Sequence, residues 1–378
     1  MRIRPFELER WQSIWENQVE LNISESGVHP MTLAELAGNP ETLQRLAEVG
    51  LGYPQTNGSE ELRSRIAALY PGARAEHALV TNGASEANYV ACWALLEPGD
   101  EVVLMQPNYM QISGVAEAFG AKVKPWWLRE NRGWVADADD LKLLLTAKTK
   151  IVAVCNPSNP TGAVMGEREI QAVCAAVSGM GAYILADEIY RGAEFNGVTT
   201  PSFWGRYERV ICTAGMSKAY GAPGLRMGWL VAEPRLAEKL WGYHDYTSIA
   251  PTMLSDRLAA LALEPSRHAR ILERTRAIIR TNYPLIQEWA KRNAGRLRHT
   301  PPKAGAIAWV GYSGGRKSAE LAETLRARHG VLLVPGTQFE MEGYLRIGFG
   351  SDATQLTEAL RRVDAEFASS ERAVATGR

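Results

Sequence analysis

A lysine in a glycine- and proline-rich loop has the clearest chemical potential of any residue in this sequence. Ser217 and Lys218 follow an apolar run, and Arg226 lies eight residues after the lysine in the segment SKAYGAPGLR. A lysine amine in such a loop can form a Schiff base with an aldehyde, while a serine hydroxyl and a guanidinium hold a phosphate on the same molecule. Taken alone, the segment is equally compatible with a solvated loop lysine.

An acidic residue at the end of a buried run is the second candidate. Asp187 closes the apolar part of AYILADEIY, and Tyr190 follows three residues later. A carboxylate in this position can pair with a protonated ring nitrogen, while the tyrosine hydroxyl reaches a ring oxygen. The alternative is a helix-capping aspartate beside a core tyrosine. For Glu188 we expect a structural role.

Two further loops follow apolar runs. In NPSNPTG (156–162) two prolines make the loop rigid, and Asn159 can present its amide to a ring or to a substrate carboxylate. In TNGASEA (81–87) the residues Gly83, Ala84 and Ser85 open a helix, where free backbone N–H groups can hold a phosphate.

The elements that position these loops are short apolar runs alternating with helix-length segments. This alternation predicts an α/β fold with a mostly parallel sheet and helices on both faces. Ligands of such sheets lie beyond the carboxyl ends of the strands, where the candidate residues fall. The expected strands cover residues 78–81, 101–105, 122–127, 151–155, 182–186 and 209–213.

The rest of the chain predicts a second, smaller α+β domain. The pattern predicts helices over residues 232–262 and 264–293. After them it predicts strands within 304–312, 330–336 and 344–350 around a helix at 317–329. The first 45 residues lack this rhythm and are expected to lie on the smaller domain. We therefore expect a large domain over 46–280 and a small domain made of 1–45 and 281–378.

Five ordered motifs carry a resemblance to a known family. TNGAS, NPSNPTG, ADEIY, SKAYGAPGLRMGW and YLRIGFG occur in this order over roughly residues 20–350. The chain thereby resembles the class I/II aminotransferases of fold type I, which use pyridoxal 5′-phosphate (PLP). The resemblance implies a PLP-dependent enzyme with a large domain built on a mostly parallel sheet.

The resemblance assigns a role to each motif residue around the cofactor ring. The lysine of the SK motif forms the Schiff base in that family, which gives this role to Lys218. Asp187 corresponds to the acid on the ring nitrogen, and Tyr190 and Asn159 correspond to the two ligands of the ring hydroxyl oxygen. Tyr109 in QPNYM corresponds to the aromatic residue stacked on the ring.

The resemblance also assigns the phosphate and the substrate contacts. Arg346 in YLRIGFG corresponds to the arginine that binds the substrate α-carboxylate, with Asn159 and, near the N-terminus, Gly27 beside it. Tyr53 corresponds to a tyrosine that reaches the phosphate of the other subunit, so the expected assembly is a homodimer with shared sites. The expected phosphate ligands within the chain are Gly83, Ala84, Ser85, Ser217 and Arg226.

The expected reaction is transfer of an amino group between an α-amino acid and a 2-oxo acid. The segments ISESGVHP and SKAYGAPGLR also resemble capreomycidine synthase and related cyclases, which eliminate and close a ring on hydroxylated arginines. Glu16, Glu25 and His29 would suit a basic or guanidino substrate. In those cyclases the ADEIY segment is altered at the tyrosine, so the intact Tyr190 of this sequence favours transamination. A cofactor-binding regulatory domain is a third alternative, for which no helix-turn-helix segment is present.

The composition of the chain bears on whether it binds nucleic acid, a membrane or a metal. The 378 residues include 42 Lys+Arg and 42 Asp+Glu, a formal net charge of zero that provides no footprint for nucleic acid or an anionic membrane. No apolar run has the length of a membrane span. The four cysteines form no C-x-x-C pair and the six histidines no metal-binding spacing, so we expect no metal and a cytoplasmic location.

Overall fold

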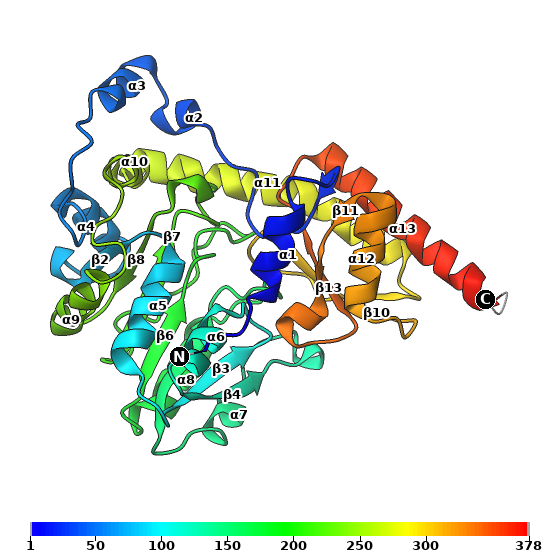
Figure 1. The fold of residues 1–378 in the computed structure, drawn as a ribbon, viewed down its shortest axis with the longest axis horizontal. Helices are drawn as coiled ribbons and strands as arrows, with labels where there is room; N and C mark the ends of the chain where they lie inside the picture. The colour runs from blue at the N-terminus through cyan, green and yellow to red at the C-terminus, as the bar shows by residue number, and fades with distance from the viewer. Residues whose placement is uncertain (1, 376–378) are drawn as a thin grey trace.

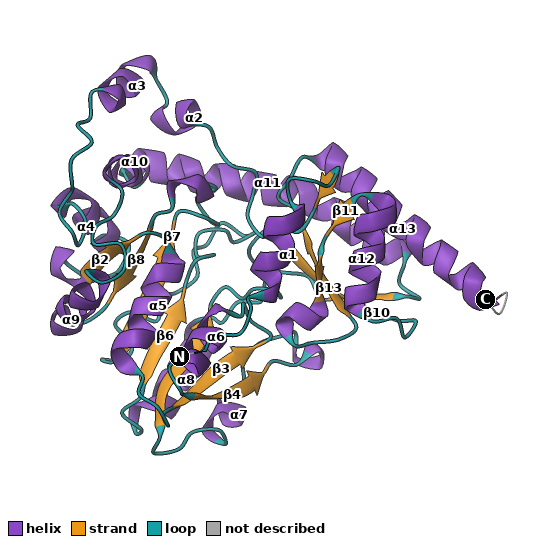
Figure 2. Ribbon diagram, viewed as in Figure 1, coloured by secondary structure: helices purple, strands orange, loops and turns teal. Residues whose placement is uncertain are grey.

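Two main sheets organise the chain, and a long helix runs from one to the other. The structure is a computed structural model that describes residues 2–375. A seven-stranded sheet and a four-stranded sheet lie apart, each with helices beside it (Figure 2). Helix α11 (Pro265–Arg292) extends between the two sheets (Figure 1).

The seven-stranded sheet is mostly parallel, as predicted. Its order is β2-β8-β7-β6-β5-β3-β4, and β8 alone is antiparallel to its neighbours β2 and β7. β8 is not among the strands expected from the sequence. The bounds are β2 Ala78–Thr81, β3 Glu101–Gln106, β4 Lys122–Trp127, β5 Thr149–Cys155, β6 Tyr183–Asp187, β7 Val210–Gly215 and β8 Gly228–Val231.

Both faces of this sheet are buried because its strands alternate between two hydrophobic clusters. In β5, Val152 and Val154 pack on one face, while Ile151 and Ala153 pack on the other. Apolar residues of α5, α6 and α9 cover the second face, and those of α8, α10 and α11 belong to the cluster of the first. A strand that is buried on both faces reads as a continuous apolar run, which is why β5 and β6 were recognisable in the sequence.

The smaller sheet is antiparallel, with the order β12-β13-β10-β9. Its strands are β9 Leu297–His299, β10 Ile307–Tyr312, β12 Val334–Pro335 and β13 Tyr344–Gly348. A short pair, β1 Leu21–Asn22 with β11 Val331–Leu332, attaches the N-terminal segment to this part of the chain. The backbone N–H of Gly348 donates to the Ile23 carbonyl over 2.7 Å, which extends the contact. The proposed division into two domains stays a prediction.

The helices agree with the expected ranges except in one place. The predicted helix over 232–262 is two helices, α9 and α10, because the intervening segment contains Ile249 with a φ of 66° and then Pro251. Helices α2 and α3 extend away from the central sheet (Figure 1). The remaining helices are α1 Glu7–Trp15, α2 Leu33–Ala37, α3 Pro40–Ala47, α4 Glu60–Ala67, α5 Ala84–Leu95, α6 Gln111–Ala118, α7 Ala138–Lys142, α8 Glu167–Ser178, α9 Pro234–His244, α10 Met253–Ala262, α12 Ser318–His329 and α13 Ala353–Ala375.

Membrane insertion of a helix finds no support in the described part of the chain. Within residues 2–375, none of the helices combines the length and the apolar character that crossing a membrane requires.

Candidate active site

A pocket of about 720 Å³ lies where the carboxyl ends of β3, β5, β6 and β7 meet the N-terminus of α5. Residues from the N-terminal segment and from β13 close its other side. The structure thus brings together residues that lie as far apart in the sequence as Gly27 and Arg346. The predicted site residues that line it are Gly27, Ala84, Ser85, Tyr109, Asn159, Asp187, Tyr190, Ser217, Lys218, Arg226 and Arg346.

Lys218 points into this pocket from the loop after β7. Its Nζ lies 3.7 Å from Oε2 of Glu25, and the nearby ammonium lowers the pKa of the Glu25 carboxyl. Gly27 lies close to the lysine: a Cβ on this glycine would come within 3.5 Å of Cδ of Lys218. The lysine amine is therefore held beside an acidic group, with one face covered by the N-terminal segment.

Asp187 lies at the end of β6 with its carboxylate held by two N–H donors. Ile189 donates its backbone N–H to Oδ1 over 3.1 Å, and Asn88 donates its side-chain N–H to Oδ2 over 3.2 Å. Burial raises the pKa of Asp187 to about 6, and the two donors act in the opposite direction. A positively charged partner in the pocket would favour the ionised carboxylate further.

The turn before α5 has the shape of an anion cradle. Gly83 has a φ of 96°, and a Cβ on it would come within 2.6 Å of the guanidinium of Arg226. Behind the turn, a Cβ on Gly228 would come within 2.2 Å of the backbone N of Ala84. Two glycines thus let the α5 N-terminus, Arg226 and strand β8 approach closely, and an anion at this point would meet both backbone N–H groups and a guanidinium.

Arg346 is buried on β13 and oriented by two acceptors. Its guanidinium donates to Oδ1 of Asn159 over 3.1 Å and to the carbonyl of Ser24 over 2.6 Å, and its side chain lies against the ring of Phe339. Nε has no hydrogen-bond partner among the described residues. A buried guanidinium next to a pocket is suited to bind a carboxylate.

Two tyrosines flank the space between Asp187 and Arg346. Tyr190 is buried, and Gly305 leaves room for its ring. Tyr109 follows β3; its hydroxyl donates to Glu9, and its ring packs on Phe6 with 4.7 Å between the centroids. Burial raises the pKa of both tyrosines further above neutral pH.

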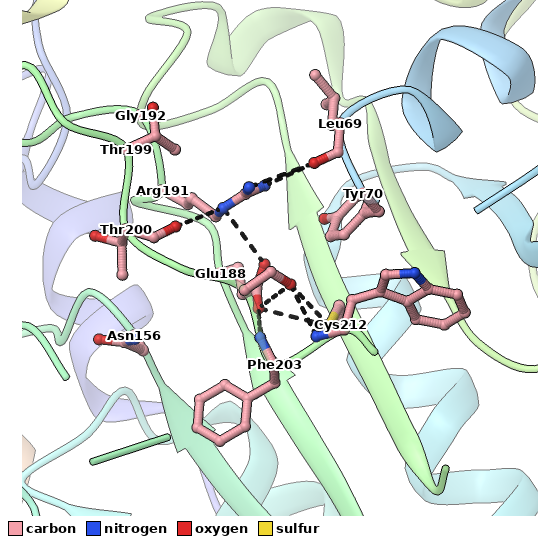
Figure 3. A network of polar contacts seen from close by, with 12 residues as sticks. Leu69, Tyr70, Asn156, Glu188, Arg191, Gly192, Thr199, Thr200, Phe203 and Cys212 are labelled. Carbon is pink, nitrogen blue, oxygen red and sulfur yellow. Dashed lines mark hydrogen bonds and ion pairs between the residues drawn. The ribbon is translucent and has the colours of Figure 1, made fainter. Parts of the chain in front are cut away.

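Glu188 does not line the pocket and belongs to a separate buried network (Figure 3). It accepts hydrogen bonds from the Ser202 hydroxyl over 2.7 Å and from the Phe203 N–H over 2.9 Å. Arg191 lies 4.0 Å from it and donates to the carbonyl of Thr200. These contacts fix the loop after β6, which agrees with the structural role expected of Glu188.

Helix α1 adds residues to the pocket that the motifs did not indicate. Glu9 and Gln12 of α1 line the pocket together with Glu16, which follows the helix and was already suggested by the sequence for a basic substrate. The three residues lie three to four positions apart and therefore share one face. Asn88 and Gln111 were also missed. The signal for Asn88 was a lone amide inside the otherwise apolar part of ASEANYVACWAL.

Tyr53 does not reach the pocket of its own chain. Its side chain is 86% exposed, and it is absent from the pocket lining. Its predicted contact with a second subunit stays a prediction.

The residues fit PLP. The α5 N-terminus with Ser85, Ser217 and Arg226 provides donors for a phosphate, and Lys218 provides an amine for the aldehyde. The buried Asp187 provides a carboxylate for the ring nitrogen. When bound, PLP supplies a ring that accepts the electron pair released when a bond at the substrate Cα breaks.

Comparison with known proteins agrees with this chemistry. Residues 34–363 match the family model described as aminotransferase class I and II. Capreomycidine synthase from Streptomyces vinaceus is 34% identical, over 95% of this chain and 93% of its own. Arginine–pyruvate transaminase AruH from Pseudomonas aeruginosa is 31% identical, over 82% and 81% respectively.

A solved structure has the same fold. The PLP-dependent cyclase OrfR superposes with a TM-score of 0.87 at 28% identity, covering 98% of both chains. This likeness confirms the predicted α/β fold with its mostly parallel sheet, and the family is PLP-dependent, as predicted. The chain belongs to the class I and II aminotransferase family.

Proposed function

We propose that this enzyme acts on the α-carbon of an amino acid with a guanidinium or similar cationic side chain. The observation that carries the proposal is the acidic wall, which we define as Glu9, Glu16 and Glu25. Of the described residues, the lysine and arginines that line the same pocket are Lys218, Arg226 and Arg346. Each has a proposed partner: the cofactor aldehyde, the phosphate and the substrate α-carboxylate. The acidic wall then faces the remaining part of the substrate, its side chain.

The electrostatics of the acidic wall support a cationic side chain. Burial raises the pKa of Glu16, and the nearby carboxylates Glu25 and Glu9 raise it further. Like charges that crowd in this way are relieved by a cation between them. Two relatives point the same way, since one is named an arginine–pyruvate transaminase and the other capreomycidine synthase, the kind of enzyme whose resemblance implied a hydroxylated arginine as substrate.

The first reaction that we propose is transamination with a 2-oxo acid. Arg346 would bind the substrate carboxylate and orient the Cα–H bond across the ring plane. Lys218 would take the proton from Cα, and Asp187 would keep the ring nitrogen protonated. Tyr190 and Asn159 would hold the ring hydroxyl oxygen, and Tyr109 would stack on the ring.

The second candidate is elimination of water from a hydroxylated arginine, followed by ring closure. The 34% sequence identity with capreomycidine synthase and the structural likeness to the cyclase OrfR favour this second reaction. A departing hydroxyl requires a proton donor, and the Lys218 ammonium, which lies 3.7 Å from Glu25, could provide the proton that it has taken from Cα. Both candidates share the binding groups and the proton transfer at Cα.

A product assay separates the two reactions. Purified enzyme is mixed with arginine or a hydroxyarginine, without any 2-oxo acid, and products are followed by mass spectrometry and visible absorption. One equivalent of a 2-oxo acid with an aminated cofactor means transamination. Repeated loss of water from the hydroxyarginine means cyclisation. Reaction with neutral amino acids alone would overturn the proposed substrate class.

The acidic wall gives a matched test of specificity. Glu16→Gln should raise KM for the basic substrate about tenfold, equivalent to ~1.4 kcal/mol, because one carboxylate facing the cation becomes neutral. Glu7→Gln at the first position of α1 is the control, since Glu7 does not line the pocket. Equal KM increases for basic and aliphatic substrates would contradict the assignment.

We also propose a homodimer in which Tyr53 completes the phosphate site of the partner. Its 86% exposure supports this role. Mixing Tyr53→Phe chains with Lys218→Ala chains should give activity above the mean of the two parents. Each hybrid dimer would contain one intact site, made from the Lys218 of one chain and the Tyr53 of the other. Activity equal to the mean would show that Tyr53 does not cross.

A further inference from the structure

A series of hydrogen bonds leads to Asp187, the proposed partner of the ring nitrogen, and none of the sequence motifs indicated it. It runs from the carbonyl of Ser85 through Gln111 and Asn88 to Asp187, with Thr213 joining from the side. Asn88 is 3% exposed and Thr213 is fully buried. Thr213 and Asp187 are register partners on the adjacent strands β7 and β6.

The direction of every bond in this chain follows from its first member. A backbone carbonyl only accepts hydrogen bonds, so Gln111 must turn its Nε2 toward Ser85. Its Oε1 then faces Asn88 and accepts from Nδ2 over 3.2 Å. Asn88 is thereby fixed with its amide nitrogen toward Gln111.

The second N–H and the oxygen of the Asn88 amide form hydrogen bonds with residues on β6 and β7. The second N–H of Nδ2 donates to Oδ2 of Asp187 over 3.2 Å, and Oδ1 accepts from the Thr213 hydroxyl over 2.7 Å. Both donors and the acceptor of the amide therefore have partners. A flipped amide would place Oδ1 against two acceptor oxygens, Oε1 of Gln111 and a carboxylate oxygen of Asp187.

We propose that Gln111 and Asn88 form an amide relay that keeps Asp187 as an ionised acceptor and links its orientation to the phosphate-binding turn at Ser85. The inference rests on the roles proposed above for Asp187 and Ser85. Asn88 and Gln111 are positioning residues, because they act on the ring nitrogen only through Asp187.

The physical basis is the stabilisation of a buried anion by a fixed donor. Burial raises the pKa of Asp187 to about 6, and the N–H groups of Ile189 and Asn88 lower it. Without the Asn88 donor the carboxylate holds a proton more readily, so the proton shared with the ring nitrogen moves toward Asp187. Asp187 would then stabilise a protonated ring nitrogen less well.

The test uses the holoenzyme reconstituted with PLP that is ¹⁵N-labelled at the ring nitrogen. The ¹⁵N chemical shift reports protonation of that nitrogen, independently of catalysis. Asn88→Leu should move the shift part of the way from the wild-type value toward that of Asp187→Ala. It should also weaken PLP binding to the apoprotein about tenfold, which corresponds to the loss of one hydrogen bond to a charged group.

Two further variants separate positioning from folding. Gln111→Leu, at a half-buried position, should move the shift in the same direction by a smaller amount, because Asn88 then loses the acceptor that fixes it. Asn293→Leu is the matched control: it removes an amide that donates to Oδ1 of Asp364 over 3.0 Å, outside the pocket. It should lower stability and leave the ¹⁵N shift unchanged.

The outcomes distinguish the relay from the role of Asp187 itself. If Asp187→Ala changes the ¹⁵N shift while Asn88→Leu and Gln111→Leu do not, the relay is overturned and the role of Asp187 stands. If Asp187→Ala leaves the shift at the wild-type value, the proposed role of Asp187 is overturned, and the relay with it.

Discussion

Replacing Lys218 with alanine should lower the turnover number by about 10⁴-fold. The amine is the proposed Schiff-base nitrogen and the proposed base for the Cα proton, and a positioned general base alone contributes about 10²- to 10⁴-fold. The lysine lies in the pocket with Nζ 3.7 Å from Glu25, and within residues 2–375 no other lysine lines this pocket. Steady-state kinetics with the substrate found in the product assay measure the effect.

Two controls make the loss specific to the amine. Lys142→Ala removes an exposed lysine of α7 that pairs with Asp139, and it should leave turnover unchanged. A small primary amine added to the Lys218→Ala enzyme should restore part of the activity, because it can enter the pocket and accept the proton. Retention of a tenth of the wild-type turnover by Lys218→Ala without added amine would remove Lys218 from its proposed role.

Much of the fold could be predicted because the central strands are buried on both faces. The run IVAVC has no polar residue to break it, and the motif residues stand directly after such runs. Parallel strands bring their carboxyl ends to one edge of a sheet, so Asn159, Asp187 and Lys218 had to lie near one another. The contact of Arg346 with Asn159 also joins two motifs that the sequence had already singled out.

The parts that could not be predicted depend on contacts between segments without a pattern of their own. Strand β8 is only four residues long and antiparallel; its apolar residues are buried in the two hydrophobic clusters, and Gly228 lies against the turn at Gly83. Glu9 belongs to the pocket because α1 lies across it, which the helix itself does not reveal. Asn88 faces Asp187 because α5 packs on β6 and β7, and its amide has no recognisable spacing to its partners.

Replacing Arg346 should lower kcat/KM by about 10²- to 10³-fold for every α-amino acid. The guanidinium is the proposed partner of the α-carboxylate, and each charged hydrogen bond to it contributes about 1.5–3 kcal/mol. Arg346→Ala also removes the donor to Asn159 and to the Ser24 carbonyl, so thermal unfolding must be measured alongside the kinetics. Arg346→Lys keeps the charge without the two-pronged geometry and should show a smaller loss.

The carboxylate assignment can be separated from general damage to the pocket by a ligand that lacks the carboxylate. The decarboxylated amine of the basic substrate retains the contacts with Lys218 and with the acidic wall. Its inhibition constant should therefore be about the same for Arg346→Lys and for the wild type, while KM for the parent amino acid rises. A parallel loss of both would mean that Arg346 acts by holding Asn159 and Ser24 in place, and an unchanged KM in Arg346→Ala would mean that the carboxylate binds elsewhere.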